Sequence, residues 1–158
     1  MCIRDSLESC LEVGLLIDRG RKSRTGEPAY QSFGKGGIVF PLKDKSGHIV
    51  SLYFRSIHVD QNGKQPAGAA RHYYLRDRQG LYPSYPAANT RKLILTESVI
   101  DAATLLQQEA ITRDFEILAL YGTNGLTKEH TKCLSGLPDL EEIVLFFDGD
   151  HAGRGASK

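Results

Sequence analysis

The sequence predicts an α/β protein, α+β overall, in which a parallel βαβαβ sheet follows a smaller, basic and strand-rich region. Three observations indicate this fold. After Arg91, short apolar runs alternate with segments of helical spacing. Two of these runs end directly before an acidic residue, Glu97 or Asp148, as parallel strands do at a ligand-binding edge. Before Arg91, the apolar runs are short and separated by turn residues, as in hairpins.

The composition is ordinary for a soluble folded protein. With 158 residues, 41% of them hydrophobic, the chain can form one domain with a core or parts of two. It has neither an apolar stretch long enough to cross a bilayer nor a signal-peptide pattern, so we expect a cytoplasmic protein without membrane contact. Cys2, Cys10 and Cys133 lack metal-ligand spacing, so we expect reduced thiols and no zinc site.

Neither end of the chain resembles the end of a domain. Residues 1–6, Met-Cys-Ile-Arg-Asp-Ser, resemble translated sequencing-adaptor sequence, so we expect a non-native leader there and exclude it from the fold. The chain stops at Lys158, just after the expected start of a helix, so we expect the natural protein to continue on both sides. Between these ends we expect a basic N-terminal subdomain over residues 7–91 and a second, C-terminally incomplete domain over residues 92–158.

The first region is expected to contain a helix and a hairpin. Residues 7–16 have helical spacing, and a basic loop over residues 19–26 follows. Residues 36–42 and 48–55 are apolar runs joined by a turn that contains glycine, which predicts an antiparallel hairpin. Beyond it we expect a polar loop, a short aromatic segment and a connector that contains proline, at residues 60–70, 72–75 and 80–89.

The second region alternates between strands and helices. We expect strands at 93–96, 116–121 and 143–147, and helices at 98–109 and 127–135. Right-handed crossovers make such strands parallel. Glu97, the turn 122–125 and Asp148 should therefore gather at one edge of the sheet.

The strongest chemical signal is Asp148-Gly149-Asp150. The glycine permits a tight turn that directs both carboxylates at one point, and such hard oxygen ligands suit Mg²⁺ or Mn²⁺. The alternative is a turn that caps a helix beginning near residue 152. Glu97 is weaker evidence, since an acid in the first helical turn also stabilises the helix dipole. Asp101, four residues on, either supports the site or is an exposed helix acid.

Two glycine-containing turns are candidate phosphate contacts. Gly122 and Thr123 lie where backbone N–H groups and a hydroxyl can meet a phosphate at the start of a helix. Gly153 similarly permits close backbone approach, with Arg154 as a phosphate contact.

The charge is unevenly distributed. Although the net charge is +1, residues 14–92 hold fourteen Lys or Arg against five Asp or Glu, whereas residues 93–158 hold five against eleven. Basic residues interleaved with aromatic ones suit single-stranded nucleic acid, because cations meet phosphates while rings stack on bases. The alternative is an ordinary solvated surface. The candidate nucleic-acid and nucleotide contacts are Lys35, Lys43, Arg55, Arg71, Arg76 and Arg78.

The acidic segments resemble a known family. Glu97-x-x-x-Asp101 after a strand, residues 120–127 (Leu-Tyr-Gly-Thr-Asn-Gly-Leu-Thr) and residues 146–154 (Phe-Phe-Asp-Gly-Asp-His-Ala-Gly-Arg) resemble the successive motifs of the Toprim domain in bacterial DnaG-type primases. Upstream, short segments resemble the basic N-terminal subdomain of that family's polymerase core, so that the resemblance spans residues 12–158. These segments are residues 38–42, 47–50, 54–55 and 72–75.

The resemblance implies a function. Glu97, Asp148 and Asp150 would be both the catalytic acids and the ligands of Mg²⁺ or Mn²⁺, and the reaction would be synthesis of short RNA primers from nucleoside triphosphates on single-stranded DNA. A replicative helicase would be a partner. Where the family has a lysine before Tyr-Leu, this chain has Tyr73. The contact of that lysine with the triphosphate must then come from Arg71 or Arg76, or be lost. The short spacing between Tyr74 and Glu97 resembles primases of phages, plasmids or conjugative elements.

Three other functions remain open from the sequence. Toprim domains also serve topoisomerases, nucleases and recombination mediators, which share the acidic motifs without the basic subdomain. A phosphatase of the D-x-D class would use Asp148 as its nucleophile, but that class places the pair after its first strand. A non-catalytic nucleic-acid-binding module of a mobile element would keep the fold alone.

Overall fold

The computed structural model describes residues 3–58, 71–75, 78–122 and 125–149. The chain divides into two compact units, Met1–Phe40 with Ser51–Arg78, and Pro41–Val50 with Gln79–Lys158. The expected boundary at residues 91 and 92 stays a prediction. No helix in the described part of the chain is long and apolar enough to cross a membrane.

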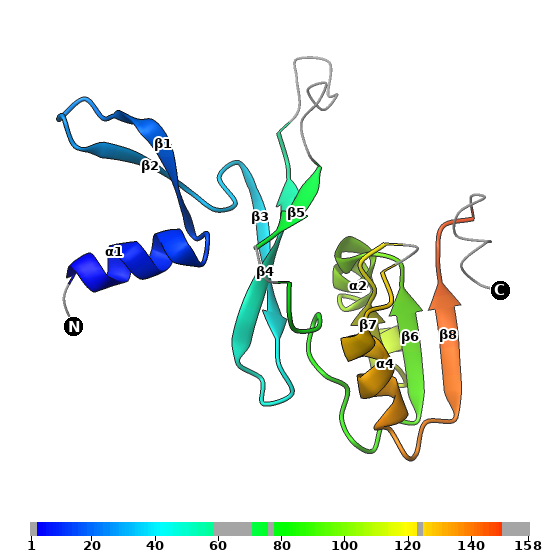
Figure 1. Cartoon of the computed structure of the whole chain (residues 1–158). Coiled ribbons are helices and arrows are strands. Elements are labelled where there is room, and N and C mark those ends of the chain that lie inside the picture. Colours follow the sequence, from blue (N-terminus) through cyan, green and yellow to red (C-terminus); the bar gives the residue numbers. More distant parts are fainter. Residues whose placement is uncertain (1–2, 59–70, 76–77, 123–124, 150–158) are drawn as a thin grey trace. The chain divides into compact units, whose positions relative to one another are not determined.

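The first unit begins with helix α1 (Ile3–Glu12) and a hairpin of strands β1 (Leu16–Lys22) and β2 (Pro28–Ser32), shown in Figure 1. The expected helix over 7–16 ends early, because Gly14 adopts φ +84° and its N–H turns back to the Leu11 carbonyl. Helix α1 also includes the last residues of the segment expected to be a leader, residues 3–6.

The expectation of a basic loop over residues 19–26 is corrected by the structure. Strand β1 continues to Lys22, and the turn of the hairpin follows it. The cross-strand hydrogen bonds of this hairpin use backbone groups, so its exposed strands need no apolar pattern. The turn is closed by the Ser23 N–H, which donates to the Glu27 carbonyl at 2.7 Å.

The expected hairpin is confirmed as strands β3 (Gly37–Lys43) and β4 (Ile49–Ser56), and strand β5 (His72–Tyr74) completes a sheet of order β3-β4-β5. Asp44 shapes the β3–β4 turn, since its Oδ1 accepts the N–H groups of Ser46 and His48 at 2.8 and 3.0 Å. The polar loop expected at residues 60–70 lies outside the described residues.

Aromatic side chains form the core of the first unit. Tyr53 and Phe54 are each 3% exposed and point to opposite faces of strand β4. Phe54 packs on Tyr73, with ring centroids 4.3 Å apart, and Tyr73 meets Phe33 edge-on at 5.2 Å. Tyr53 packs on Tyr74 at 5.1 Å. Tyr73 is therefore a packing residue of this unit.

The second unit contains the predicted parallel sheet. Its strands are β6 (Lys92–Thr96), β7 (Glu116–Ala119) and β8 (Glu142–Phe146), in the order β7-β6-β8 with both pairs parallel. Its helices are α2 (Val99–Leu105), α3 (Glu109–Thr112) and α4 (Lys128–Ser135). The expected helix 98–109 is shorter than predicted, because Gln108 is extended and caps the separate helix α3.

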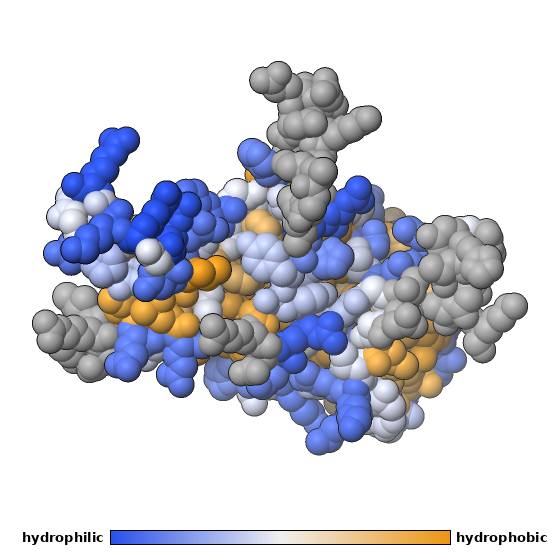
Figure 2. All heavy atoms as spheres, turned by 45° about the horizontal axis from the view of Figure 1, so that its top comes forward, coloured by the Kyte–Doolittle hydropathy of each residue, from blue (hydrophilic) through white to orange (hydrophobic). Residues whose placement is uncertain are grey.

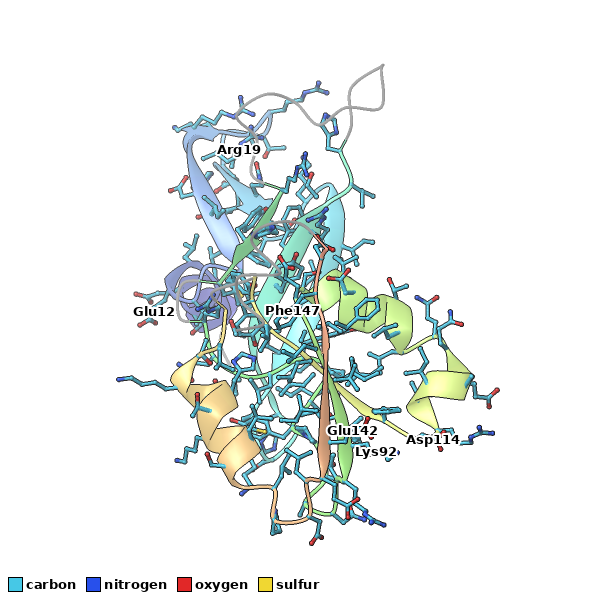
Figure 3. All side chains as sticks on the ribbon, turned by 90° about the vertical axis from the view of Figure 1, so that its right-hand side faces the viewer. Glu12, Arg19, Lys92, Asp114, Glu142 and Phe147 are labelled. Carbon is cyan, nitrogen blue, oxygen red and sulfur yellow. The ribbon has the colours of Figure 1, made fainter. Side chains whose placement is uncertain are left out.

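The central strand β6 is almost completely buried. Helices α2 and α4 lie on opposite faces of the sheet (Figures 1 and 3). On one face, Leu93 and Leu95 pack with Leu118 and with Cys133 of α4. Strand β8 lies at the edge, where Leu145 and Phe146 are 44% and 50% exposed. Because the buried strand is central, the residues that directly follow β6 are fixed in position at the carboxyl edge.

Candidate functional site

Two of the predicted acids meet at the carboxyl edge of the sheet. Glu97 directly follows β6 and Asp148 follows β8, and these strands are neighbours, with Thr96 opposite Phe146. The Asp148 N–H donates to Oε2 of Glu97 at 3.1 Å, and the Glu97 N–H donates to the Phe146 carbonyl at 3.2 Å. The ends of two strands that are 51 residues apart in sequence are thus joined at the acids.

The third acid, Asp150, lies outside the described residues, as do Thr123, Gly153 and Arg154. Within the parts of the chain that the structure describes, no three His, Cys, Asp or Glu side chains form a metal cluster. Gly149 has open space where a Cβ would be. The described part of the site therefore consists of two carboxylate-bearing residues and a glycine that directly follows one of them.

Asp101 shapes the turn that carries Glu97. Its Oδ2 accepts the Ser98 hydroxyl at 2.7 Å and the Ser98 N–H at 3.2 Å, while the Ser98 hydroxyl accepts the Asp101 N–H. This is a capping box at the start of α2. Thr96 adds a hydrogen bond from its hydroxyl to the Ser98 carbonyl at 2.9 Å. Asp101 thus fixes the backbone that follows Glu97.

The turn after β7 reaches the same edge. The Gly122 N–H donates to the Glu97 carbonyl at 2.9 Å, and the Gly125 N–H donates to the Gly122 carbonyl at 2.7 Å. Gly122 has φ +101°, which favours glycine, and a Cβ on Gly125 would lie 2.3 Å from the Tyr121 backbone. Both glycines are therefore required by the backbone of this turn.

His130, which sequence reasoning missed, links strand β7 to helix α4. It is fully buried, and its Nε2 lies 3.0 Å from the Ala119 carbonyl oxygen. Because a carbonyl only accepts, Nε2 carries the proton, and Nδ1 accepts from the N–H and hydroxyl of Thr127 at 3.2 and 2.7 Å. The spacing Thr127-x-x-His130 is a capping box with His at its third position, and this signal could have identified it.

Glu129 holds the connector that precedes the sheet. Its Oε2 accepts the Gly80 N–H at 3.0 Å and its Oε1 accepts the Tyr85 hydroxyl at 2.6 Å, while the Tyr121 hydroxyl donates to the Gly80 carbonyl. Burial, together with the hydrogen bond and the charge of Glu129, raises the pKa of Tyr85 well above its usual range. Sequence reasoning missed this network, since each of its hydrogen bonds joins residues more than 40 positions apart.

The basic candidates lie in different settings. Arg55 is opposite His72 on strands β4 and β5, and the guanidinium of Arg78 lies 5.1 Å from the centre of the Tyr74 ring. Burial and then the charge of Arg55 lower the pKa of His72. Burial raises the pKa of Tyr74 to about 12, although the charge and hydrogen bond of Arg78 lower it.

The register places Arg55, His72, Tyr53 and Tyr74 on one face of the β3-β4-β5 sheet, so one guanidinium shares this face with three rings. Lys35 and Arg71 are exposed, Lys43 is half-buried in the second unit, and Arg76 lies outside the described residues.

Comparison with known proteins gives concordant matches. Residues 94–158 match the model of the Toprim-like family. Over 98% of its length the chain is 29% identical to a DNA primase from Haemophilus influenzae, and over 76% it is 30% identical to a DNA primase from Borreliella burgdorferi. It spans 24% and 22% of the lengths of these relatives.

A solved structure matches as well. The crystal structure of a DNA primase domain from Pseudomonas aeruginosa superimposes with a TM-score of 0.66 at 26% identity, covering 96% of this chain and 44% of that one. The likeness includes both compact units, since 96% of the chain is covered.

Proposed function

We propose that this chain carries the catalytic acids for synthesis of short RNA primers on single-stranded DNA, because residues 94–158 match the Toprim-like family and the chain is similar to DNA primases. The reaction is metal-dependent nucleotidyl transfer in DNA replication, and its setting is the cytoplasm. The observation that carries the proposal is the meeting of Glu97 and Asp148 at the carboxyl ends of β6 and β8.

The residues present suit Mg²⁺ or Mn²⁺. Carboxylate oxygens are the ligands these ions prefer, and Glu97, Asp148 and Asp150 would hold them. When bound, the ions offset the negative charge of a nucleoside triphosphate and make its phosphorus more open to attack. The chain's own contribution is positional, because Asp101 and Gly122 hold the backbone around Glu97.

The basic side chains would bind the template and the nucleoside triphosphates. Arg55 and Arg78 support this role best, since each lies beside an aromatic ring on the β3-β4-β5 sheet. Lys35, Lys43, Arg71 and Arg76 would add phosphate contacts, and Gly122, Thr123, Gly153 and Arg154 would contact phosphates near the acids. Tyr73 packs against Phe54, so it does not replace the family's lysine as a phosphate contact. A replicative helicase would be a partner.

The test is incorporation of labelled ribonucleotides on unprimed single-stranded DNA by the protein encoded in the complete reading frame. We expect short products with Mg²⁺ or Mn²⁺, and their loss in Asp148→Ala. Asp114→Ala is the matched control, because this exposed acid lies at the opposite edge of the sheet (Figure 3).

The other outcomes separate the alternatives. Metal-dependent cutting or rejoining of DNA without synthesis would assign the protein to the nucleases or topoisomerases. DNA binding with no metal-dependent activity, unchanged in Asp148→Ala, would indicate a binding module.

A further inference from the structure

The first unit contains an apolar pocket that the acidic site does not use. Its volume is about 550 Å³, within the range of pockets that take small organic groups. It lies where the end of α1, the start of β1 and strand β5 meet, and all of its walls belong to this one unit. Its main lining residues are Leu11, Leu16, Ile17, Phe33, Tyr73 and Tyr74.

The walls suit a flat aromatic ring. Phe33 and Tyr73 are nearly perpendicular, at 85°, so a planar group that stacks on one ring turns its own edge toward the other. Leu16 and Ile17 add apolar contact.

The surroundings of the pocket are strongly basic. Strand β1 supplies Leu16, Ile17 and Asp18 to the wall and continues directly into Arg19, Arg21 and Lys22, all exposed. Figure 2 shows this juxtaposition on the first unit, with apolar side chains directly beside the hydrophilic hairpin. An apolar ring bordered by cations fits the base and the phosphates of one strand.

We propose that this pocket binds one unpaired nucleobase of a single DNA strand, while the cations of strand β1 contact the adjoining phosphates. This proposal rests on the proposed function, because the bound strand would be the single-stranded DNA template of primer synthesis. The two can fail separately, since the pocket is tested by binding and the acids by synthesis.

The test fills the pocket without disturbing the core. Ile17 is 49% exposed, so Ile17→Trp adds a ring to the wall and leaves the buried residues unchanged. Ile38→Trp is the matched control, because Ile38 is 48% exposed on strand β3 and does not line the pocket. Thermal unfolding of both variants verifies their folding.

Affinity of the complete protein is measured by fluorescence anisotropy with a labelled single-stranded oligonucleotide. We expect Ile17→Trp to weaken binding on the order of tenfold, the usual effect of losing one stacked base. The salt dependence should stay unchanged, because the phosphate contacts remain. Arg21→Ala should instead reduce the salt dependence.

A series of oligonucleotides, each with one abasic position, completes the test. We expect one position to weaken binding to the wild-type protein and to have no effect on Ile17→Trp. Equal affinities of Ile17→Trp and Ile38→Trp, or no sensitive abasic position, would overturn the proposal. A free nucleoside triphosphate is also tested as a competitor of the oligonucleotide. If it competes with the wild-type protein but not with Ile17→Trp, the pocket binds a nucleotide, and the assignment to a DNA strand is overturned.

Discussion

The backbone N–H of Asp148 donates to Oε2 of Glu97 across 3.1 Å, so one carboxylate fixes the start of the loop that carries the second. The two acids are therefore not independent. A change at Glu97 that removes the acceptor also releases the backbone at Asp148, whereas a change that keeps an oxygen there removes only the charge.

Glu97→Gln separates these effects. The amide oxygen still accepts the Asp148 N–H, so unfolding free energy should change by less than about 1 kcal/mol. Loss of a charged ligand should weaken Mn²⁺ binding at least about tenfold in isothermal titration, which corresponds to a loss of about 1.4 kcal/mol in binding free energy. Glu116→Gln, at the start of β7, is the control. Unchanged Mn²⁺ affinity in Glu97→Gln would rule out Glu97 as a ligand.

Gly80→Ala should destabilise the second unit. Gly80 has φ +81°, and a Cβ there would lie 2.8 Å from Val50 and 2.9 Å from the backbone of Leu42 and Lys43. Gly47 has φ +82° with nothing within 4 Å, so Gly47→Ala shares only the backbone strain. We expect Gly80→Ala to lose about 1–3 kcal/mol more than Gly47→Ala in urea unfolding, from steric overlap. Equal losses would contradict this packing.

The Tyr85–Glu129 hydrogen bond should appear as a coupling energy. Tyr85→Phe and Glu129→Gln each alter the 2.6 Å contact between the Tyr85 hydroxyl and Oε1. In a double-mutant cycle we expect a coupling of about 0.5–3 kcal/mol in unfolding free energy. Tyr30→Phe replaces Tyr85→Phe in the control cycle, because Tyr30 lies on strand β2 in the other compact unit. Additive effects of Tyr85→Phe and Glu129→Gln would refute the contact.

The charge of Arg55 should be measurable at His72. Burial and then Arg55 lower the pKa of His72, so the folded state favours the neutral ring. The stability that this ring contributes is present above the usual pKa of about 6.5 and is lost as pH falls through the lower, folded value. Arg55→Gln should raise the pKa of His72 in an NMR titration, whereas Arg24→Gln should not. No change in Arg55→Gln would show that burial alone lowers the pKa.

The parallel sheet was predictable because its signals are local. Strand β6 is a short apolar run that is buried along its length, and the helices beside it follow polar capping residues, Ser98 and Thr127. The strands end where the acids begin, so the edge that unites Glu97 with Asp148 followed from the order of the elements.

The remaining features depend on contacts that sequence does not show. Strand β1 is polar, and its pairing with β2 uses backbone groups that carry no residue pattern. The hydrogen bond from Gly80 to Glu129 joins residues 49 positions apart. From the sequence, His130 resembles an exposed helix residue, whereas in the structure its Nε2 lies beside the Ala119 carbonyl. Tertiary contacts decide each of these.

The most direct test of the metal site uses Fe²⁺ in place of Mg²⁺ in the complete protein, with peroxide and ascorbate, so that radicals formed at the bound ion cut the nearby backbone. Mapping of the fragments should place cuts beside Glu97 and beside Asp148, with both sets lost together in Asp148→Ala and retained in Asp114→Ala. Cuts confined to other segments, or cuts that persist in Asp148→Ala, would contradict a shared metal centre at the ends of β6 and β8.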